Sequence, residues 1–323
     1  MTIIFSANDD YSTTKVIEWL AHYGANFIRV NSDELVTNTV NVNIQKNNFS
    51  ITLKLNDNII DLKKVKNIWY RGGNLLRFIP NKFQTVDTEL QRVLLKNIAF
   101  ENDSLIDFFY TFSKNASNIG SYDTYQLNKL HCLKMAALVG LNVPNSLVTT
   151  SKEELIKFKR MNKNIITKGI QEVFEGQYKS SGYYNSTEII TDEIIENLPD
   201  NFFASLFQEQ LSKRVEIRTF FLNNKLYSAA IFSQLDPKTK VDFRNYNYEK
   251  PNRMVVFNLP GQMEEKICEL MNKLNLNTGS IDLIYTDKKE FYFLEINPVG
   301  QYDFVSKSCN YNLDKKIARE LIR

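Results

Sequence analysis

Two apolar segments near the C-terminus, each interrupted by an acidic residue, limit the possible folds more than any other part of the chain. Ser280–Tyr285 and Phe291–Ile296 are rich in the Ile, Leu, Phe and Tyr residues expected of core strands, and a short polar turn separates them. We therefore expect an antiparallel pair. Because the two strands run side by side, Asp282 of the first should lie near Glu295 of the second.

The strand pair also carries an amide. Asn297 follows Glu295 by two positions, so both side chains point to the same side. Asp282, Glu295 and Asn297 then offer two carboxylates and an amide oxygen, the hard oxygen ligands that Mg²⁺ prefers when it also bridges nucleotide phosphates. Burying these acids among apolar neighbours without a cation would cost free energy. The alternative is an edge strand whose acids are solvated.

The composition describes a globular chain without a strong electrostatic field. Hydrophobic residues make up 43% of its 323 residues, enough for about two or three packed units. The 40 basic and 37 acidic side chains leave a net charge of +3. Nucleic acid and anionic membranes are therefore not expected as partners.

The location is expected to be cytoplasmic. The N-terminal sequence MTIIFSANDDYS lacks the basic and long apolar regions of a signal peptide, and no window approaches the about 18 uninterrupted apolar residues of a membrane span. Three cysteines, Cys132, Cys268 and Cys309, are far apart and odd in number. Free thiols in a reducing compartment explain them better than a disulfide framework does.

Several common catalytic motifs are absent from the sequence. It contains no Gly-x4-Gly-Lys-Ser/Thr loop, no Gly-x-Gly-x-x-Gly after a strand, no His-Glu-x-x-His and no Cys-x-x-Cys. The only histidines are His22 and His131. A histidine-based triad or zinc site is therefore not expected.

The first part of the chain predicts a small α/β domain. Thr2–Phe5 and Asn26–Val30 are short apolar strands, and Thr13–Tyr23 between them has apolar residues at helical spacing. The other elements expected here are a hairpin of Val40–Ile44 and Phe49–Leu55, a strand at Asn67–Tyr70 and a helix at Thr85–Glu101.

Residues Ser113–Tyr122 are rich in Ser, Asn and Gly and are expected to link this domain to a second region. Helices are expected there at Lys129–Val139, Ser151–Phe158 and Gly261–Leu274. The strands expected are one starting at Val143, then Ile165–Lys168, Glu188–Thr191, Leu206–Leu211, Val215–Leu222 and Lys225–Ile231, before the C-terminal pair.

The acid and amide set, in the contexts DLIY and FLEINPVGQ, resembles the magnesium motif of ATP-grasp enzymes such as D-alanine ligase and glutathione synthetase. The resemblance spans roughly residues 120–323. It implies ATP and Mg²⁺ as ligands and an α/β (α+β) ATP-grasp fold. Its parts would be an N-terminal α/β domain at residues 1–118 and two ATP-grasp subdomains, 119–205 and 206–323, that clamp the nucleotide.

Two lysines match the phosphate-binding lysines of that family. NKLHCLKMAALVGLNVP is similar to the helix that carries the first, which places it at Lys129, and IITKG is similar to the strand that carries the second, which places it at Lys168. A lysine at the end of an apolar strand is oriented by its neighbours and offers a point charge to phosphates. Solvated surface lysines remain the alternative for both.

FQEQL followed by RVEIR resembles the segment where the family binds adenosine. The resemblance implies Glu209, Gln210 and Leu211 at the base, and Glu216 at the ribose hydroxyls. Strand alternation puts Glu216 and Arg218 on one face, so an acceptor for the sugar lies beside a cation for phosphate.

Two arginines are implied as catalytic residues, Arg218 and, in VDFR, Arg244, which matches a cation near the γ-phosphate. Plain surface charges are the alternative for each. One departure from the family concerns its glycine-rich loop, which here reads QEVFEGQYKSSGYYNS and has only Gly176 and Gly182. Contacts of a lid to phosphate cannot be assigned from it.

The segments IWYR, VDFR and NPVGQYDFV resemble graspetide synthetases. These are microviridin-type ATP-grasp ligases, including those of grasp-with-spasm systems, that macrocyclise ribosomal precursor peptides, and the similarity covers nearly the whole chain. It implies a precursor peptide with leader and core segments as partner. Its Asp or Glu side chains would be activated as acyl phosphates and closed into ω-ester or ω-amide crosslinks. For IWYR alone, a buried Trp with a structural Arg is the alternative.

Two other functions remain open. A related ligase could join a free amino acid or small acid to a protein or metabolite, and a nucleotide-binding module could act without turnover. A nucleic-acid-binding protein is disfavoured, because basic residues are dispersed and form no motif with aromatic residues. The sequence leaves open the peptide, the ring pattern and whether the chain forms a homodimer.

Overall fold

The computed structural model describes residues 1–31, 39–46, 48–55, 58–72, 88–112, 117–171, 175–178, 181–184, 187–234 and 251–323. The chain forms two compact units. The first contains Met1–Gln126, Gln301–Ser306 and Asn312–Arg323, and the second contains Leu127–Gly300 and Lys307–Tyr311. Subdomain boundaries after residues 118 and 205 stay a prediction.

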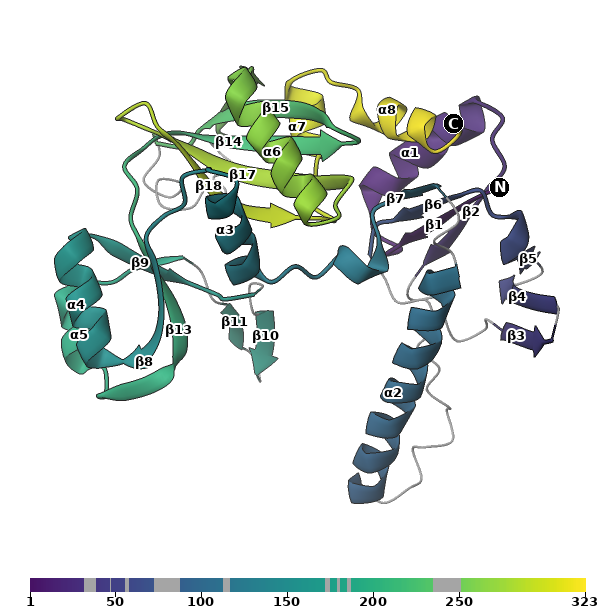
Figure 1. Cartoon of the computed structure of the whole chain (residues 1–323), viewed down its shortest axis with the longest axis horizontal. Coiled ribbons are helices and arrows are strands. Elements are labelled where there is room, and N and C mark those ends of the chain that lie inside the picture. The colour runs from purple at the N-terminus through teal and green to yellow at the C-terminus, as the bar shows by residue number, and fades with distance from the viewer. Residues whose placement is uncertain are drawn as a thin grey trace. The chain divides into compact units, whose positions relative to one another are not determined.

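The first unit is built on a four-stranded parallel sheet in the order β2-β1-β6-β7 (Figure 1). The inner strand β1 is buried at every position, which fits the three apolar residues Ile3, Ile4 and Phe5 at its centre. The strands are β1 (Thr2–Ser6), β2 (Phe27–Asn31), β6 (Asn67–Tyr70) and β7 (Ser117–Ile119).

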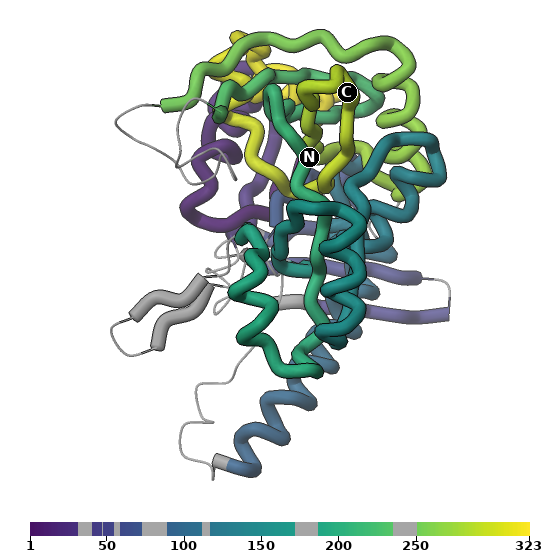
Figure 2. Tube along the Cα trace, turned by 90° about the vertical axis from the view of Figure 1, so that its left-hand side faces the viewer, coloured from purple at the N-terminus to yellow at the C-terminus, as the bar shows by residue number. Residues whose placement is uncertain are grey.

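The remaining elements of this unit are helices and a small antiparallel sheet. Helix α1 begins after Asp10, whose carboxylate accepts from the backbone N–H of Thr13. The chain ends lie near each other (Figure 2), because the Thr2 hydroxyl donates to the carbonyl of Leu321 over 3.2 Å. The elements are α1 (Tyr11–His22), β3 (Thr39–Gln45), β4 (Asn48–Leu55), β5 (Asn58–Asp61), η2 (Leu62–Lys64), α2 (Thr88–Phe112), η5 (Tyr122–Thr124) and α8 (Leu313–Glu320), with α7 (Asp303–Ser308) starting here.

The Trp-Tyr-Arg sequence at the end of β6 lies in the interior of the first unit. Trp69 and Tyr70 are each 1% exposed. The Arg71 guanidinium pairs with Asp10 over 3.2 Å and lies 5.6 Å from the ring centre of Tyr302. These contacts join the end of β6 to the start of α1, which is the structural role that the sequence left open for this arginine.

Loss of the Asp10 charge is expected to weaken this unit. Burial raises the pKa of Asp10, but Arg71 and Thr13 outweigh it and hold the pKa below its usual range. The pKa of Asp10 is lower in the folded protein than in the unfolded protein, where it is about 3.9. Ionised Asp10 therefore stabilises the fold at pH values above about 3.9, and this stability is lost as the pH falls through the pKa of the folded protein. Asp10→Asn should therefore cost about 1–3 kcal/mol at neutral pH and less at about pH 3, which lies below the unfolded pKa.

Urea unfolding at both pH values measures this difference. Asp9→Asn is the matched control, since Asp9 is the exposed neighbour. A cost for Asp10→Asn that is the same at both pH values would contradict the role of the Asp10–Arg71 pair.

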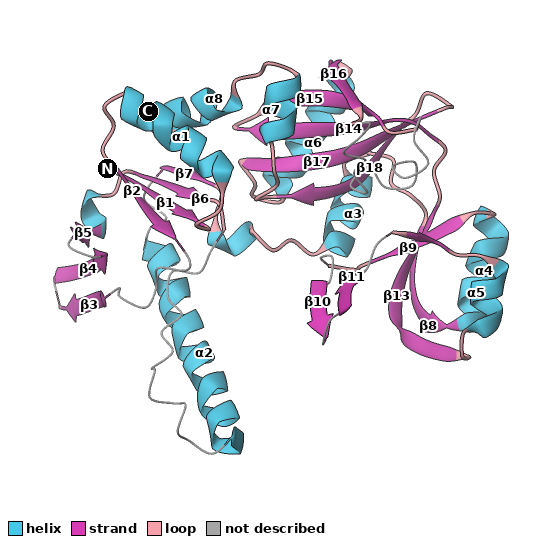
Figure 3. Cartoon of the chain, turned by 180° about the vertical axis from the view of Figure 1, so that it is seen from behind, coloured by secondary structure: helices cyan, strands magenta, loops and turns pink. Residues whose placement is uncertain are grey.

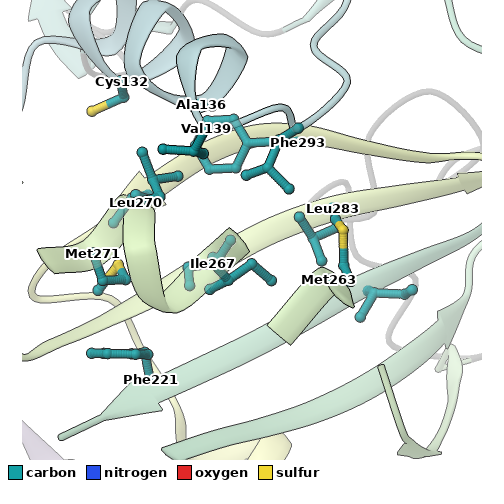
Figure 4. Packing of buried hydrophobic residues seen from close by; sticks show 14 of the residues in the cluster. Cys132, Ala136, Val139, Phe221, Met263, Ile267, Leu270, Met271, Leu283 and Phe293 are labelled. Atoms are coloured by element: carbon teal, nitrogen blue, oxygen red, sulfur yellow. The ribbon is translucent and has the colours of Figure 1, made fainter. Parts of the chain in front are cut away.

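The second unit contains a five-stranded antiparallel sheet in the order β16-β15-β14-β17-β18. Helices α3 and α6 pack against it, and Figure 4 shows their side chains directed at the strands. Ile267 and Leu270 of α6 and Phe293 of β18 are fully buried there. The elements are α3 (Lys129–Leu138), β14 (Lys213–Leu222), β15 (Lys225–Phe232), β16 (Arg253–Phe257), α6 (Gly261–Lys273), β17 (Thr278–Thr286) and β18 (Phe291–Asn297).

A four-stranded antiparallel sheet, β12-β9-β13-β8, forms the other part of this unit. Helices α4 and α5 lie side by side against it (Figure 3), and Leu155 of α4 and Ile195 of α5 pack with Phe207 of β13. The elements are β8 (Ser146–Ser151), α4 (Lys152–Asn162), β9 (Ile165–Lys168), β12 (Glu188–Ile189), α5 (Asp192–Asn197) and β13 (Asn201–Glu209), with a separate hairpin of β10 (Glu175–Tyr178) and β11 (Ser181–Tyr184).

Most of the predicted elements are confirmed, and four predictions were wrong in detail. The helix expected at Thr85–Glu101 is α2, which continues to Phe112. Part of the expected linker is β7, which pairs with β6 because Ile119 is buried. Thr191 does not extend a strand but caps α5, accepting from Ile194. The strand expected from Val143 begins at Ser146.

Within the described part of the chain, no helix combines the length and the apolar character needed to cross a membrane.

Candidate active site

The acidic residues of the C-terminal strand pair face each other. Strands β17 and β18 pair so that Asp282 lies opposite Glu295 and Ser280 lies opposite Asn297. Positions two apart on a strand share a face, so Asp282, Glu295 and Asn297 project from the same side of the sheet. The predicted strand pairing is confirmed, and the metal-binding role of the three residues stays a prediction.

Each acid has a basic partner. Arg218 of β14 lies opposite Asp282, and its Nη1 donates to Oδ1 over 2.7 Å and to Oδ2 over 2.6 Å. Lys129, the first residue of α3, places Nζ 3.3 Å from Oε2 of Glu295. Because all four side chains are largely shielded from water, these pairs offset the cost of burying charge.

Asn297 is more exposed than the two acids. Its Oδ1 accepts from the backbone N–H of Val299 over 3.2 Å, which fixes the amide at the end of β18. A carbonyl oxygen has a second lone pair, so this contact does not exclude a metal ligand role.

A cavity of about 600 Å³ lies beside the acids and is lined from both sheets of the second unit. Seven residues predicted for the site line it: Lys168, Glu209, Gln210, Leu211, Glu216, Asp282 and Glu295. Lys129, Arg218 and Asn297 are not among its lining residues, although Lys129 and Arg218 contact the lining acids Glu295 and Asp282. Arg244 lies outside the described residues.

The segment after β13 is fixed by hydrogen bonds at its start. Glu209 accepts through Oε1 from the backbone N–H of Asn145 over 2.9 Å, and its own N–H donates to the Asn145 carbonyl. The Gln210 N–H donates to the carbonyl of Asn164 over 2.9 Å. The Glu209 side chain therefore orients the main chain of this segment, which lines one wall of the cavity.

Glu216 lies on β14 and is 7% exposed. Its Oε1 accepts from Lys213 Nζ and from the Ser233 hydroxyl, each over 2.8 Å. Burial raises the pKa of Glu216, and Lys213 and Ser233 offset this only in part.

Sequence reasoning missed both partners of Glu216. Residues three apart on a regular strand face opposite sides, so Lys213 should point away from Glu216. A register shift between Lys213 and Val215 turns the lysine to the same side. No sequence signal marks this irregularity, and Ser233 approaches from the end of the neighbouring strand β15.

The chain matches two protein families along its length. Residues 1–113 match the family described as MvdD pre-ATP grasp domain, and residues 126–321 match the family described as RimK-like ATP-grasp domain. No curated protein matches the chain.

Solved structures share the fold of the whole chain. One is a RiPP-associated ATP-grasp ligase from Chryseobacterium gregarium in complex with ADP and a leader and core peptide (TM-score 0.85, 23% identity, 99% of this chain and 94% of that chain covered). Another is the macrocyclase MdnC from Microcystis aeruginosa MRC, bound with the precursor peptide MdnA (TM-score 0.80, 24% identity, 100% and 99% covered). Macrocyclase MdnB from the same organism is also similar (TM-score 0.77, 20% identity, 99% of each chain covered).

These comparisons confirm the predicted α/β ATP-grasp fold and the resemblance to ATP-grasp enzymes. The RimK-like match alone extends over more than half of the 323 residues and includes the acid pair, its basic partners and the cavity. The chain belongs to the RimK-like ATP-grasp family.

Proposed function

We propose that this protein is an ATP-dependent ligase that crosslinks a ribosomally made precursor peptide. It activates Asp or Glu side chains of the peptide as acyl phosphates and closes them into ω-ester or ω-amide rings. The observation that carries the proposal is the opposed pair Asp282 and Glu295 beside a cavity that Lys168 and Glu216 also line. Support for the peptide comes from the similar structures, which hold precursor or leader and core peptides.

The residues of the acid pair fit Mg²⁺. Among the described residues no three His, Cys, Asp or Glu side chains gather into a metal site. Asp282 and Glu295 would hold the ion together with the amide oxygen of Asn297, and nucleotide phosphates would supply further oxygen ligands. When bound, Mg²⁺ offsets the charge of the triphosphate.

The nucleotide lies in the cavity in this proposal. The main chain of residues 209–211 binds the base, because the Glu209 side chain holds that segment in place. Glu216 accepts from the ribose hydroxyls. Lys129 and Lys168 offer charge to the α- and β-phosphates.

The reaction has two steps. A carboxylate oxygen of the peptide attacks the γ-phosphorus of ATP and ADP leaves, while Arg218 and Arg244 stabilise the transferring phosphoryl group. A Ser or Thr hydroxyl or a Lys amine of the same peptide then attacks the acyl carbonyl, loses its proton and expels inorganic phosphate. Positioning supplies most of the rate enhancement, so no nucleophile of the enzyme is required.

Mass spectrometry tests the reaction. The protein, ATP, Mg²⁺ and a precursor peptide encoded beside its gene should give a product that has lost one water per crosslink, with one ADP released each time. A product that gains the mass of an amino acid would instead identify a ligase for free amino acids or small acids. Nucleotide binding without phosphate release, whatever the peptide, would identify a module without turnover.

The proposal includes a cytoplasmic location. Cys132, Cys268 and Cys309 are free thiols, and Cys132 and Cys309 are buried. A reducing compartment keeps such thiols unpaired.

A further inference from the structure

The two carboxylate oxygens of Glu216 have different surroundings. Oε1 accepts from Lys213 Nζ and from the Ser233 hydroxyl, each over 2.8 Å. Oε2 has no hydrogen-bond partner among the described residues, although Glu216 is 7% exposed. Because Glu216 lines the cavity, an acceptor is available to a ligand that carries hydroxyl groups.

We infer that Lys213 and Ser233 are positioning residues that hold Oε1 and leave Oε2 of Glu216 for the hydroxyls of the bound ligand. The inference rests on the proposed function, in which these are the ribose hydroxyls of the nucleotide. It adds a specificity role for two residues outside the predicted site.

The geometry favours positioning over a purely structural ion pair. Two donors converge on one oxygen, and they come from different strands, with Lys213 at the irregular start of β14 and Ser233 just after β15. Ser233 is fully buried, and the Lys213 side chain is 9% exposed. With one oxygen fixed by two bonds, the carboxylate cannot rotate to offer a different acceptor.

Burial of Glu216 increases the importance of Lys213 and Ser233 for keeping its carboxylate ionised. It raises the pKa of Glu216, which favours the neutral acid, whereas the Lys213 charge and the hydrogen bonds from Lys213 and Ser233 lower it. The Asp282 charge raises the pKa further, so Lys213 and Ser233 are the two groups that favour the ionised acceptor.

Calorimetric titration with ADP and Mg²⁺ tests the inference without a peptide. Lys213→Met should weaken ADP binding by about tenfold or more, because a charge-assisted hydrogen bond to the ligand is no longer aligned. Binding of an ADP analogue that lacks both ribose hydroxyls should change by less than about twofold. Lys213→Arg should restore most of the affinity, and Ser233→Ala should show a smaller, equally selective loss.

Lys273→Met is the matched control, since Lys273 forms an exposed pair with Glu269 on α6 and does not line the cavity. Equal losses for ADP and the analogue in Lys213→Met would mean a structural role and would overturn the inference. If Lys213→Met does not fold, Ser233→Ala provides the test. A Ser233→Ala protein that prefers ADP to the analogue as strongly as the wild type does would overturn the inference. The wild type could prefer ADP to the analogue and yet form no crosslink in a precursor peptide. That result refutes the proposed function and leaves this inference standing.

Discussion

Glu295→Gln is expected to reduce product formation by about a thousandfold or more while the protein stays folded. The substitution keeps the shape of the side chain and removes one of only two carboxylates in the proposed metal site. Metal stabilisation of a transferring phosphoryl group is worth several kcal/mol, and each 1.36 kcal/mol is a factor of ten in rate. Asn297→Ala should also abolish product formation.

The fold should tolerate the change at Glu295. Its partner Lys129 keeps 21% of its side chain exposed and can be hydrated when the carboxylate is lost. Turnover and the apparent affinity for Mg²⁺ are measured together, since a lost metal ligand lowers both. Glu290→Gln is the matched control, because Glu290 is an exposed residue between β17 and β18 and does not line the cavity. Wild-type activity in Glu295→Gln would show that the metal site has been assigned to the wrong residues.

Local patterns predicted the acid pair because its geometry is local. Strands β17 and β18 follow each other in the sequence and are joined by one short turn. The two apolar segments and this turn fix their pairing. Local reasoning also predicted the helix that opens at Ser151, where the Ser151 hydroxyl accepts from the backbone N–H of Glu154 at the start of α4. These features depend on residues a few positions apart.

Local sequence patterns did not predict contacts between segments that are far apart in the sequence. The sequence puts Glu216 and Arg218 on one face of a strand, but it does not show that Arg218 lies opposite Asp282. That register brings together residues sixty-four positions apart, on strands whose apolar side chains share one core with α3 and α6. The edge strand β7 is similar, since only one of its three residues, Ile119, is apolar, and the segment pairs with β6 only once the sheet exists.

The contact between Arg218 and Asp282 has a consequence for stability as well as for catalysis. In this structure both oxygens of Asp282 accept from Arg218, and the same acid is proposed to bind Mg²⁺. In that proposal, Arg218 and the metal ion would compensate the same negative charge. Binding of the metal with its nucleotide would free the guanidinium charge for the transferring phosphoryl group.

Arg218→Met is accordingly expected to have two separable effects. Product formation should fall by about a thousandfold, the scale of losing a cation that stabilises a phosphoryl transition state. Without nucleotide the protein should lose about 2–3 kcal/mol of stability, below the 3–5 kcal/mol of a fully buried pair because the Asp282 side chain is 14% exposed.

Mg²⁺ and ADP should recover more stability in Arg218→Met than in the wild type, because the metal replaces the missing cation beside Asp282. Thermal unfolding with and without Mg²⁺ and ADP measures this difference. Arg253→Met is the matched control, since Arg253 is an exposed residue of β16 in the same sheet. Mg²⁺ and ADP could instead stabilise Arg218→Met less than the wild type. The metal would then not replace the Arg218 charge beside Asp282, and this prediction would be wrong.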